Sequence, residues 1–143
     1  MFDFCEQSFK LKTVLTIAMQ MVPRLEYLHS KNFVHRDMKP ENIVIGQGKK
    51  ASMVYLIDFG LAKRFLCPKT GIHIPFKADK GIIGTAKFLS LSTHRGNECS
   101  RRDDLEALGI VLIYFLRNGS LPWDMPKPLV NTIDPKDPYF EQK

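Results

Sequence analysis

Two short apolar runs in the first half of the chain limit how it can fold. They occupy residues 43–45 and 53–57, and the seven residues between them include Gly46 and Gly48. Apolar runs of this length joined by a Gly-containing turn predict a β-hairpin. Because the strands of a hairpin are antiparallel, the residue before the first strand should lie beside the residue after the second.

Two longer segments have the periodicity of helices. From residue 11 to residue 31, apolar side chains recur every three to four positions, which predicts a helix with one buried stripe and a kink at Pro23. A second helix is predicted after Ser100, which opens a capping-box pattern; apolar residues cover nearly all its faces, so we expect it to be buried on most sides. Residues 61–99 lack a sustained period and predict a long loop. The fold class is therefore mainly α with a small β-hairpin.

Composition and charge exclude several classes of protein. The 143 residues suffice for one domain or part of one, and no apolar run approaches the roughly 20 residues of a membrane span. The first residues do not resemble a signal peptide, so we expect an intracellular protein, cytoplasmic or nuclear, without a membrane partner. Cys5, Cys67 and Cys99 are widely spaced and are expected to be reduced thiols. The net charge of +6 favours anionic partners.

The polar residues that flank the predicted hairpin indicate a chemistry. Asn42 precedes the first strand and Asp58 follows the second, so an amide oxygen and a carboxylate are expected to converge. Such oxygen ligands suit Mg²⁺, which keeps phosphate and water in its remaining positions. Asp37 is then placed to receive a hydroxyl proton, and Lys39 to stabilise charge on a transferring phosphoryl group. These residues predict phosphoryl transfer. His29 and His94, by contrast, are expected to pack or to face solvent.

The same segments resemble the signatures of the protein kinases. Residues 35–42 match the catalytic-loop pattern H-R-D-x-x-x-x-N, residues 58–60 are D-F-G, and Lys39 points to the serine/threonine branch. Further segments resemble the casein kinase I family and occur in that family's order: 11–15, 29–33, 73–75, 84–86, 100–106 and 119–123. The resemblance implies a partial protein kinase domain over residues 1–123, with the fold of the helical C-terminal lobe. Residues 124–143 form a divergent tail.

The resemblance also implies cofactors and roles. ATP and Mg²⁺ would be the cofactors, and protein substrates would carry acidic or phosphorylated residues; we expect no nucleic-acid partner. The implied roles are catalysis for Asp37 and Lys39, nucleotide and metal binding for Asn42 and Asp58, structural support for His35, Arg36, Gly60 and Asp104, and substrate-anion binding for Lys87. Lys87 stands where the family has an arginine, so its grip on an anion is expected to be weaker.

Part of the kinase pattern is not found in these residues. No G-x-G-x-x-G occurs, because Ala51 stands where a third glycine would follow Gly46 and Gly48. We therefore expect an incomplete kinase domain that lacks the N-terminal lobe and the last C-terminal helices. The isolated chain should then have little or no activity, because phosphoryl transfer depends on positioning. Two alternatives stay open: a non-enzymatic module that binds substrates or a regulatory partner, and a partial gene product.

Overall fold

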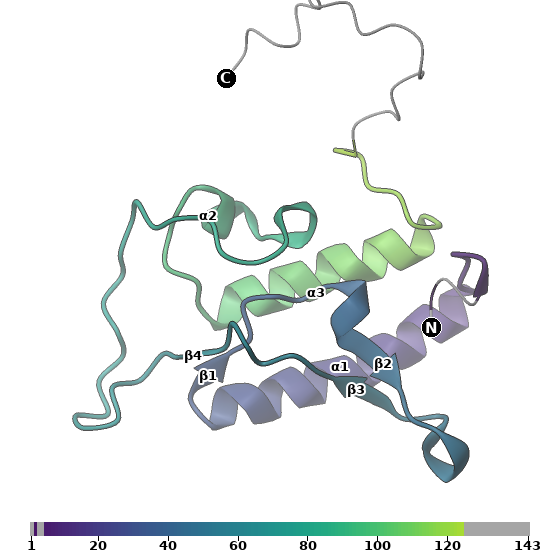
Figure 1. Ribbon diagram of the computed structural model, residues 1–143, viewed down its shortest axis with the longest axis horizontal. Coiled ribbons are helices and arrows are strands. Elements are labelled where there is room, and N and C mark those ends of the chain that lie inside the picture. Colours follow the sequence, from purple (N-terminus) through teal and green to yellow (C-terminus); the bar gives the residue numbers. More distant parts are fainter. Residues whose placement is uncertain (1, 3–4, 125–143) are drawn as a thin grey trace, which may run out of the picture.

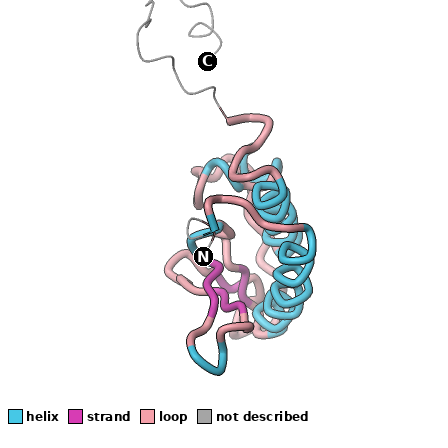
Figure 2. Tube along the Cα trace, turned by 90° about the vertical axis from the view of Figure 1, so that its right-hand side faces the viewer, coloured by secondary structure: helices cyan, strands magenta, loops and turns pink. Residues whose placement is uncertain are grey.

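The computed structural model describes residue 2 and residues 5–124 (Figure 1). Two long helices lie side by side, and the short strands and loops lie mainly on one side of them (Figure 2). In chain order the elements are α1 (Leu11–Ser30), β1 (Phe33–Val34), η2 (Pro40–Asn42), β2 (Ile43–Ile45), η3 (Gly48–Lys50), β3 (Val54–Leu56), β4 (Lys63–Arg64), η4 (Ala86–Phe88), α2 (Leu91–His94) and α3 (Arg101–Leu116).

The core lies between α1 and α3, which run antiparallel. The rings of Phe9 and Phe115 lie 5.2 Å apart at one end of the pair, and His29 contacts Asp104 at 2.8 Å at the other. Burial of each large apolar side chain contributes about 1.5–3 kcal/mol. The buried apolar residues of the two helices are Val14, Ile17, Met21, Leu25, Ala107, Leu108, Val111 and Phe115.

The first predicted helix is confirmed, and it continues through Pro23. Proline lacks an amide proton, so the carbonyl of Met19 loses its usual helical partner. Pro23 is exposed and Met19 is 77% exposed, so water can satisfy that carbonyl. The core stripe on the opposite side of the helix is undisturbed, which explains how α1 tolerates a proline. The kink itself stays a prediction.

The predicted hairpin is also confirmed. β2 pairs antiparallel with β3, with Ile43 opposite Leu56, and the amide of Ile57 donates to the carbonyl of Asn42 at 3.0 Å. A second antiparallel pair, β1 with β4, was not expected from the sequence. Its strands have two residues each, too few to carry a period. Apart from β4, η4 and α2, residues 61–99 are irregular, as predicted.

The expectation for α3 is wrong in part. Its buried residues form one stripe toward α1, whereas Leu105, Ile113 and Leu116 are each about half exposed. Apolar side chains on several faces do not bury a helix unless another element packs on each face. The N-terminus agrees better with the sequence: the carboxylate of Asp103 accepts from the amide of Ser100 at 2.7 Å, which is one arm of the predicted capping box.

Three smaller expectations can be compared with the structure. Cys5, Cys67 and Cys99 form no disulfide, as predicted. No helix in the described ranges has the length and apolar character to cross a bilayer. The predicted tail lies outside the described residues, except for Asp124.

Candidate active site

A buried carboxylate from α3 holds the loop that follows β1. Asp104 is only 1% exposed, and it accepts hydrogen bonds from the backbone amides of His35 at 2.8 Å and Arg36 at 2.9 Å. The ring of His29 contacts the same carboxylate at 2.8 Å, so the expectation that His29 packs or faces solvent missed its main contact. Arg36 has a φ of +70°, an uncommon conformation for a side-chain-bearing residue. The hydrogen bond from its backbone amide to Asp104 helps to hold this conformation.

His35 connects this loop to the end of the hairpin. The ring is fully buried, and its Nδ1 accepts from the amide of Asp37 at 3.3 Å. Its Nε2 lies 3.1 Å from the carbonyl of Ile57, which can only accept, so the ring proton belongs on Nε2. The ring also lies edge-on to Phe59, with centroids 5.2 Å apart. One histidine ring thus joins the loop, the end of β3 and the D-F-G segment.

Asp37 lies at the centre of the polar cluster and is 6% exposed. Its Oδ1 accepts from the amide of Thr85 at 3.0 Å and from the Thr85 hydroxyl at 2.8 Å. Its Oδ2 lies 2.8 Å from Nζ of Lys39 and 3.3 Å from the side-chain nitrogen Nδ2 of Asn42. Burial works to raise the pKa of Asp37, but the hydrogen bonds from Lys39 and Thr85 outweigh it, so this pKa lies below its usual value. The carboxylate is ionised at neutral pH.

Lys39 and Asn42 surround this carboxylate with complementary groups. The hydrogen bond to Asp37 raises the pKa of Lys39, so the ammonium stays charged. Asn42 is buried, and its side-chain nitrogen donates to the carbonyl of Asp37 at 2.8 Å. That contact orients the amide and leaves its oxygen to face another partner. A small pocket of about 10 Å³ separates Asp37 from the start of α3, and neither Lys39 nor Asn42 lines it.

Asp58 lies at the same end of the hairpin as Asn42, as the sequence predicted. The strand register places Asn42 opposite Ile57, and Asp58 is the next residue. Asp58 is exposed, has a φ of +62°, and accepts from the amide of Gly60 at 3.2 Å. An amide oxygen and an exposed carboxylate form a donor set that fits Mg²⁺. That both oxygens reach one ion stays a prediction.

The loop after β4 closes over Asp37. Arg36 donates from Nε to the carbonyl of Leu61 at 2.6 Å, and so contacts the chain just before β4. Gly84 has a φ of +101°, and a Cβ there would lie 2.5 Å from the carbonyl oxygen of Arg36. Only glycine permits this approach, which brings Thr85 to Asp37. The role of Thr85 was missed from the sequence, because no spacing rule links residues 48 positions apart.

Lys87, the predicted anion-binding residue, is paired within the chain. Its Nζ lies 2.8 Å from Oδ2 of Asp124 and 4.6 Å from the ring centroid of Tyr114. Asp124 also accepts from the amide of Leu121 at 2.7 Å, and the hydrogen bond from Lys87 holds the pKa of Asp124 below its usual value. An anion that binds Lys87 therefore meets an ammonium that is already paired with a carboxylate.

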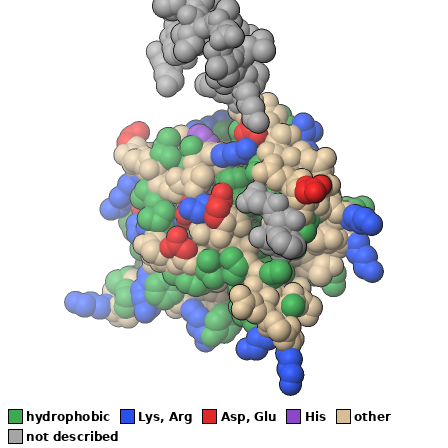
Figure 3. Space-filling view, turned by 45° about the vertical axis from the view of Figure 1, so that its right-hand side comes forward, with side chains coloured by type: hydrophobic (Ala, Val, Ile, Leu, Met, Phe, Trp, Pro, Cys, Tyr) green, Lys and Arg blue, Asp and Glu red, His purple; other side chains and the backbone are tan. Residues whose placement is uncertain are grey.

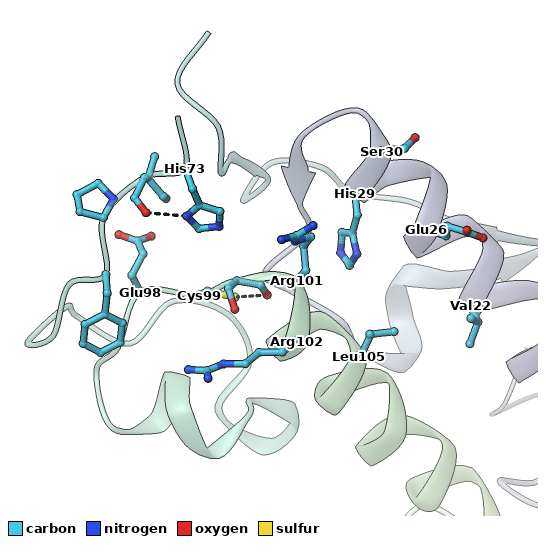
Figure 4. Close-up of a pocket in the computed structure, with 14 residues that line it drawn as sticks. Val22, Glu26, His29, Ser30, His73, Glu98, Cys99, Arg101, Arg102 and Leu105 are labelled. Carbon is cyan, nitrogen blue, oxygen red and sulfur yellow. Dashed lines mark hydrogen bonds between the residues drawn. The ribbon is translucent and has the colours of Figure 1, made fainter. Parts of the chain in front are cut away.

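A large cavity lies away from Asp37. It measures about 1100 Å³ and lies between the second half of α1, the start of α3 and the loop at residues 73–76 (Figure 4). His29 and Arg101 are among its lining residues, whereas Asp37, Asn42 and Asp58 are not. His29 is therefore the connection between this cavity and the cluster, through its bond to Asp104.

The geometry agrees with a comparison to known families. The family model described as the protein kinase domain matches residues 1–135 of the chain. The match includes every residue of the cluster described above.

Proposed function

Because the chain belongs to the protein kinase domain family, we propose that its polar cluster transfers a phosphoryl group from ATP to serine or threonine hydroxyls of proteins, as casein kinase I enzymes do. The observation that carries this proposal is the environment of Asp37. An ionised carboxylate, a lysine ammonium at 2.8 Å and an oriented asparagine amide meet at the end of a hairpin that also carries Asp58. Phosphoryl transfer requires such positioned charges more than it requires covalent chemistry.

Each residue then has a definite task. Asp37 orients the substrate hydroxyl and accepts its proton; its lowered pKa makes it a weak base, which suffices where the transition state is loose. Lys39 places a fixed positive charge beside the transferring group. Asn42 and Asp58 are the residues that would hold Mg²⁺. ATP would supply the phosphoryl group, and the metal ion would neutralise part of the charge on the phosphates. Thr85 holds Asp37 in place from the opposite side.

The substrates we propose carry acidic or phosphorylated residues near the target hydroxyl. Lys87 is the cation that would recognise them, and the face of Tyr114 beside it favours a positive charge. Asp124 occupies the position of such an anion and competes with it. The preference for anionic substrates is therefore expected to be modest, since one carboxylate must be exchanged for another.

The test is Mg²⁺-dependent binding of ATP and phosphate transfer to an acidic serine peptide by the chain of residues 1–143. We expect weak nucleotide binding that is lost in Asp58→Asn, and slow transfer that is lost in Asp37→Asn. Turnover should lie well below the usual kinase range of about 1–100 s⁻¹, because these residues contain no Gly-rich phosphate-covering loop. Glu6→Gln, which removes an exposed carboxylate that precedes α1, serves as the control.

Two results would count against this proposal. If ATP binding does not depend on Mg²⁺ or on Asp58, the metal assignment fails. If transfer by the chain equals that of Asp37→Asn, the residues do not catalyse the reaction by themselves. Binding of a phosphorylated peptide without ATP binding would instead favour the non-enzymatic module.

A further inference from the structure

Apolar side chains remain at the surface of both long helices. The space-filling view shows hydrophobic side chains at the surface, with lysines and arginines among and around them (Figure 3). On α1, Met19 is 77% exposed, Leu11 60% and Leu15 53%, and Val22 is about half exposed. Their spacing of three to four residues places them on one face, beside the buried stripe. Such a face on a stable helix favours association with another surface.

The residues of this face are evenly spaced about Met19, and the two ends of the face carry opposite charges. Lys12 lies seven residues before Met19, and Glu26 lies seven residues after it. Leu15 and Pro23 lie four residues on either side. At 3.6 residues per turn, positions four and seven residues away share the face of the central residue. The face therefore carries a positive end, an apolar centre and a negative end. A two-fold rotation about an axis through Met19 places the positive end of one copy opposite the negative end of the other.

Neither charge has a partner within its own chain. Among residue 2 and residues 5–124, the side chains of Lys12 and Glu26 form no hydrogen bond or ion pair. Lys12 also lies in the first turn of α1, where the helix dipole disfavours a cation. Intrachain interactions thus do not account for this arrangement of charges.

We propose that this face binds a second copy of the chain, with the two α1 helices packed antiparallel across a two-fold axis at Met19. In that arrangement Lys12 of each copy lies opposite Glu26 of the other, and Leu15 packs beside Val22 and Pro23 of the second copy. A two-fold contact requires one surface to complement itself, and these charges do so only when the helices are antiparallel. A parallel pair would place like charges together.

The contact is small, so it should be weak and depend on concentration. The two ion pairs are separated by 14 residues, or about 21 Å along the helix. A few half-exposed apolar side chains and two solvent-exposed ion pairs correspond to the low end of protein interfaces. We expect a dissociation constant on the order of tens of micromolar. The inference concerns assembly and does not depend on the proposed phosphoryl transfer.

The test is sedimentation of the full 143-residue chain over a range of concentrations, with charge reversals on α1. K12E alone and E26K alone should each weaken self-association at least fivefold, because each variant places like charges together. An equimolar mixture of the two variants should associate again, since every contact between unlike copies is then complementary. The double variant K12E/E26K should self-associate like the wild type. K49E, which reverses an exposed lysine at the hairpin tip, is the matched control and should change nothing.

Loss of folding cannot imitate this pattern. K12E moves a negative charge into the first turn of α1, which the helix dipole favours, so helix content by circular dichroism should not fall. M19K, which places two lysines at the axis, should abolish association by an independent route. A wild-type chain that stays monomeric up to about ten times the expected dissociation constant overturns the proposal. So does self-association that K12E and M19K leave unchanged, or a mixture of K12E and E26K that stays monomeric.

Discussion

Replacement of Asp104 by asparagine tests how the catalytic loop is held. The carboxylate accepts three hydrogen bonds, from the amides of His35 and Arg36 and from the ring of His29, and it is 1% exposed. Asparagine has nearly the same shape but only one acceptor oxygen. Whichever way its amide turns, one of the two backbone amides faces an NH₂ group and loses its acceptor.

The cost can be worked out from these contacts. A buried donor that loses its acceptor costs about 1–3 kcal/mol, and a bond to a charged acceptor is worth about 1.5–3 kcal/mol. His29 can change its tautomer and keep its hydrogen bond. We therefore count the loss of one hydrogen bond from a backbone amide and the weakening of the other two hydrogen bonds. Asp104→Asn should therefore lower the free energy of unfolding by about 2–4 kcal/mol. At this chain length that corresponds to a fall in Tm of about 6–12 °C.

The assay is urea unfolding, together with hydrogen exchange at the amides of His35 and Arg36. Both amides should exchange faster in Asp104→Asn, and one of them should change more than the other. Glu41→Gln removes an equal charge from an exposed site and should stay within about 0.5 kcal/mol of the wild type. If Asp104→Asn also stays within about 0.5 kcal/mol, with both amides protected, Asp104 does not hold the loop.

Three further predictions can be measured on the same chain. Pro23→Ala should raise the free energy of unfolding by about 1–3 kcal/mol, because the alanine amide can donate a hydrogen bond to the carbonyl of Met19. A loss of stability in urea would contradict a helical conformation at residue 23. Burial works to raise the pKa of Asp37, but hydrogen bonds outweigh it and hold this pKa below its usual value, so the stabilising effect of the carboxylate is complete above about pH 5 and is lost as the pH falls further. The difference in unfolding free energy between the wild type and Asp37→Asn should thus be constant above about pH 5 and change only in acid; a difference that changes near neutral pH would refute this. Asp124→Asn should tighten the binding of a phosphorylated peptide about two- to fivefold, measured by fluorescence anisotropy, whereas Lys87→Met should weaken it; equal affinities in all three chains would remove Lys87 from the anion site.

The elements that the sequence predicts correctly are those with a local signal. α1 has a buried stripe from Val14 to Leu25, and the hairpin has two apolar runs and a Gly-containing turn. β1 and β4 have no such signal, since two residues cannot display alternation. The error over α3 has another cause. Periodicity reports which side chains are apolar, whereas burial depends on whether another element packs against them, as the exposed Leu105 and Ile113 show.

In the candidate site too, the contacts that follow from a local rule were predicted, and those between residues far apart in the sequence were not. Asn42 and Asp58 could be brought together from the sequence, because a hairpin relates its two ends by a simple rule. The contact between Thr85 and Asp37 spans 48 residues, and the bond from Asp104 to His35 spans 69. No local pattern encodes such pairs, and only the family resemblance suggested the role of Asp104. The pairing of Lys87 with Asp124 was missed for the same reason.

The distribution of charge explains why the net charge understates how basic the surface is. Three acidic side chains, Asp37, Asp103 and Asp104, are buried, and each accepts hydrogen bonds from backbone or side-chain donors. No lysine or arginine in the described part of the chain is buried to that degree. An approaching molecule therefore meets a surface on which basic groups outnumber acidic ones by more than the sequence count indicates. Because folding buries these carboxylates, the exterior is cationic and favours the approach of anionic molecules.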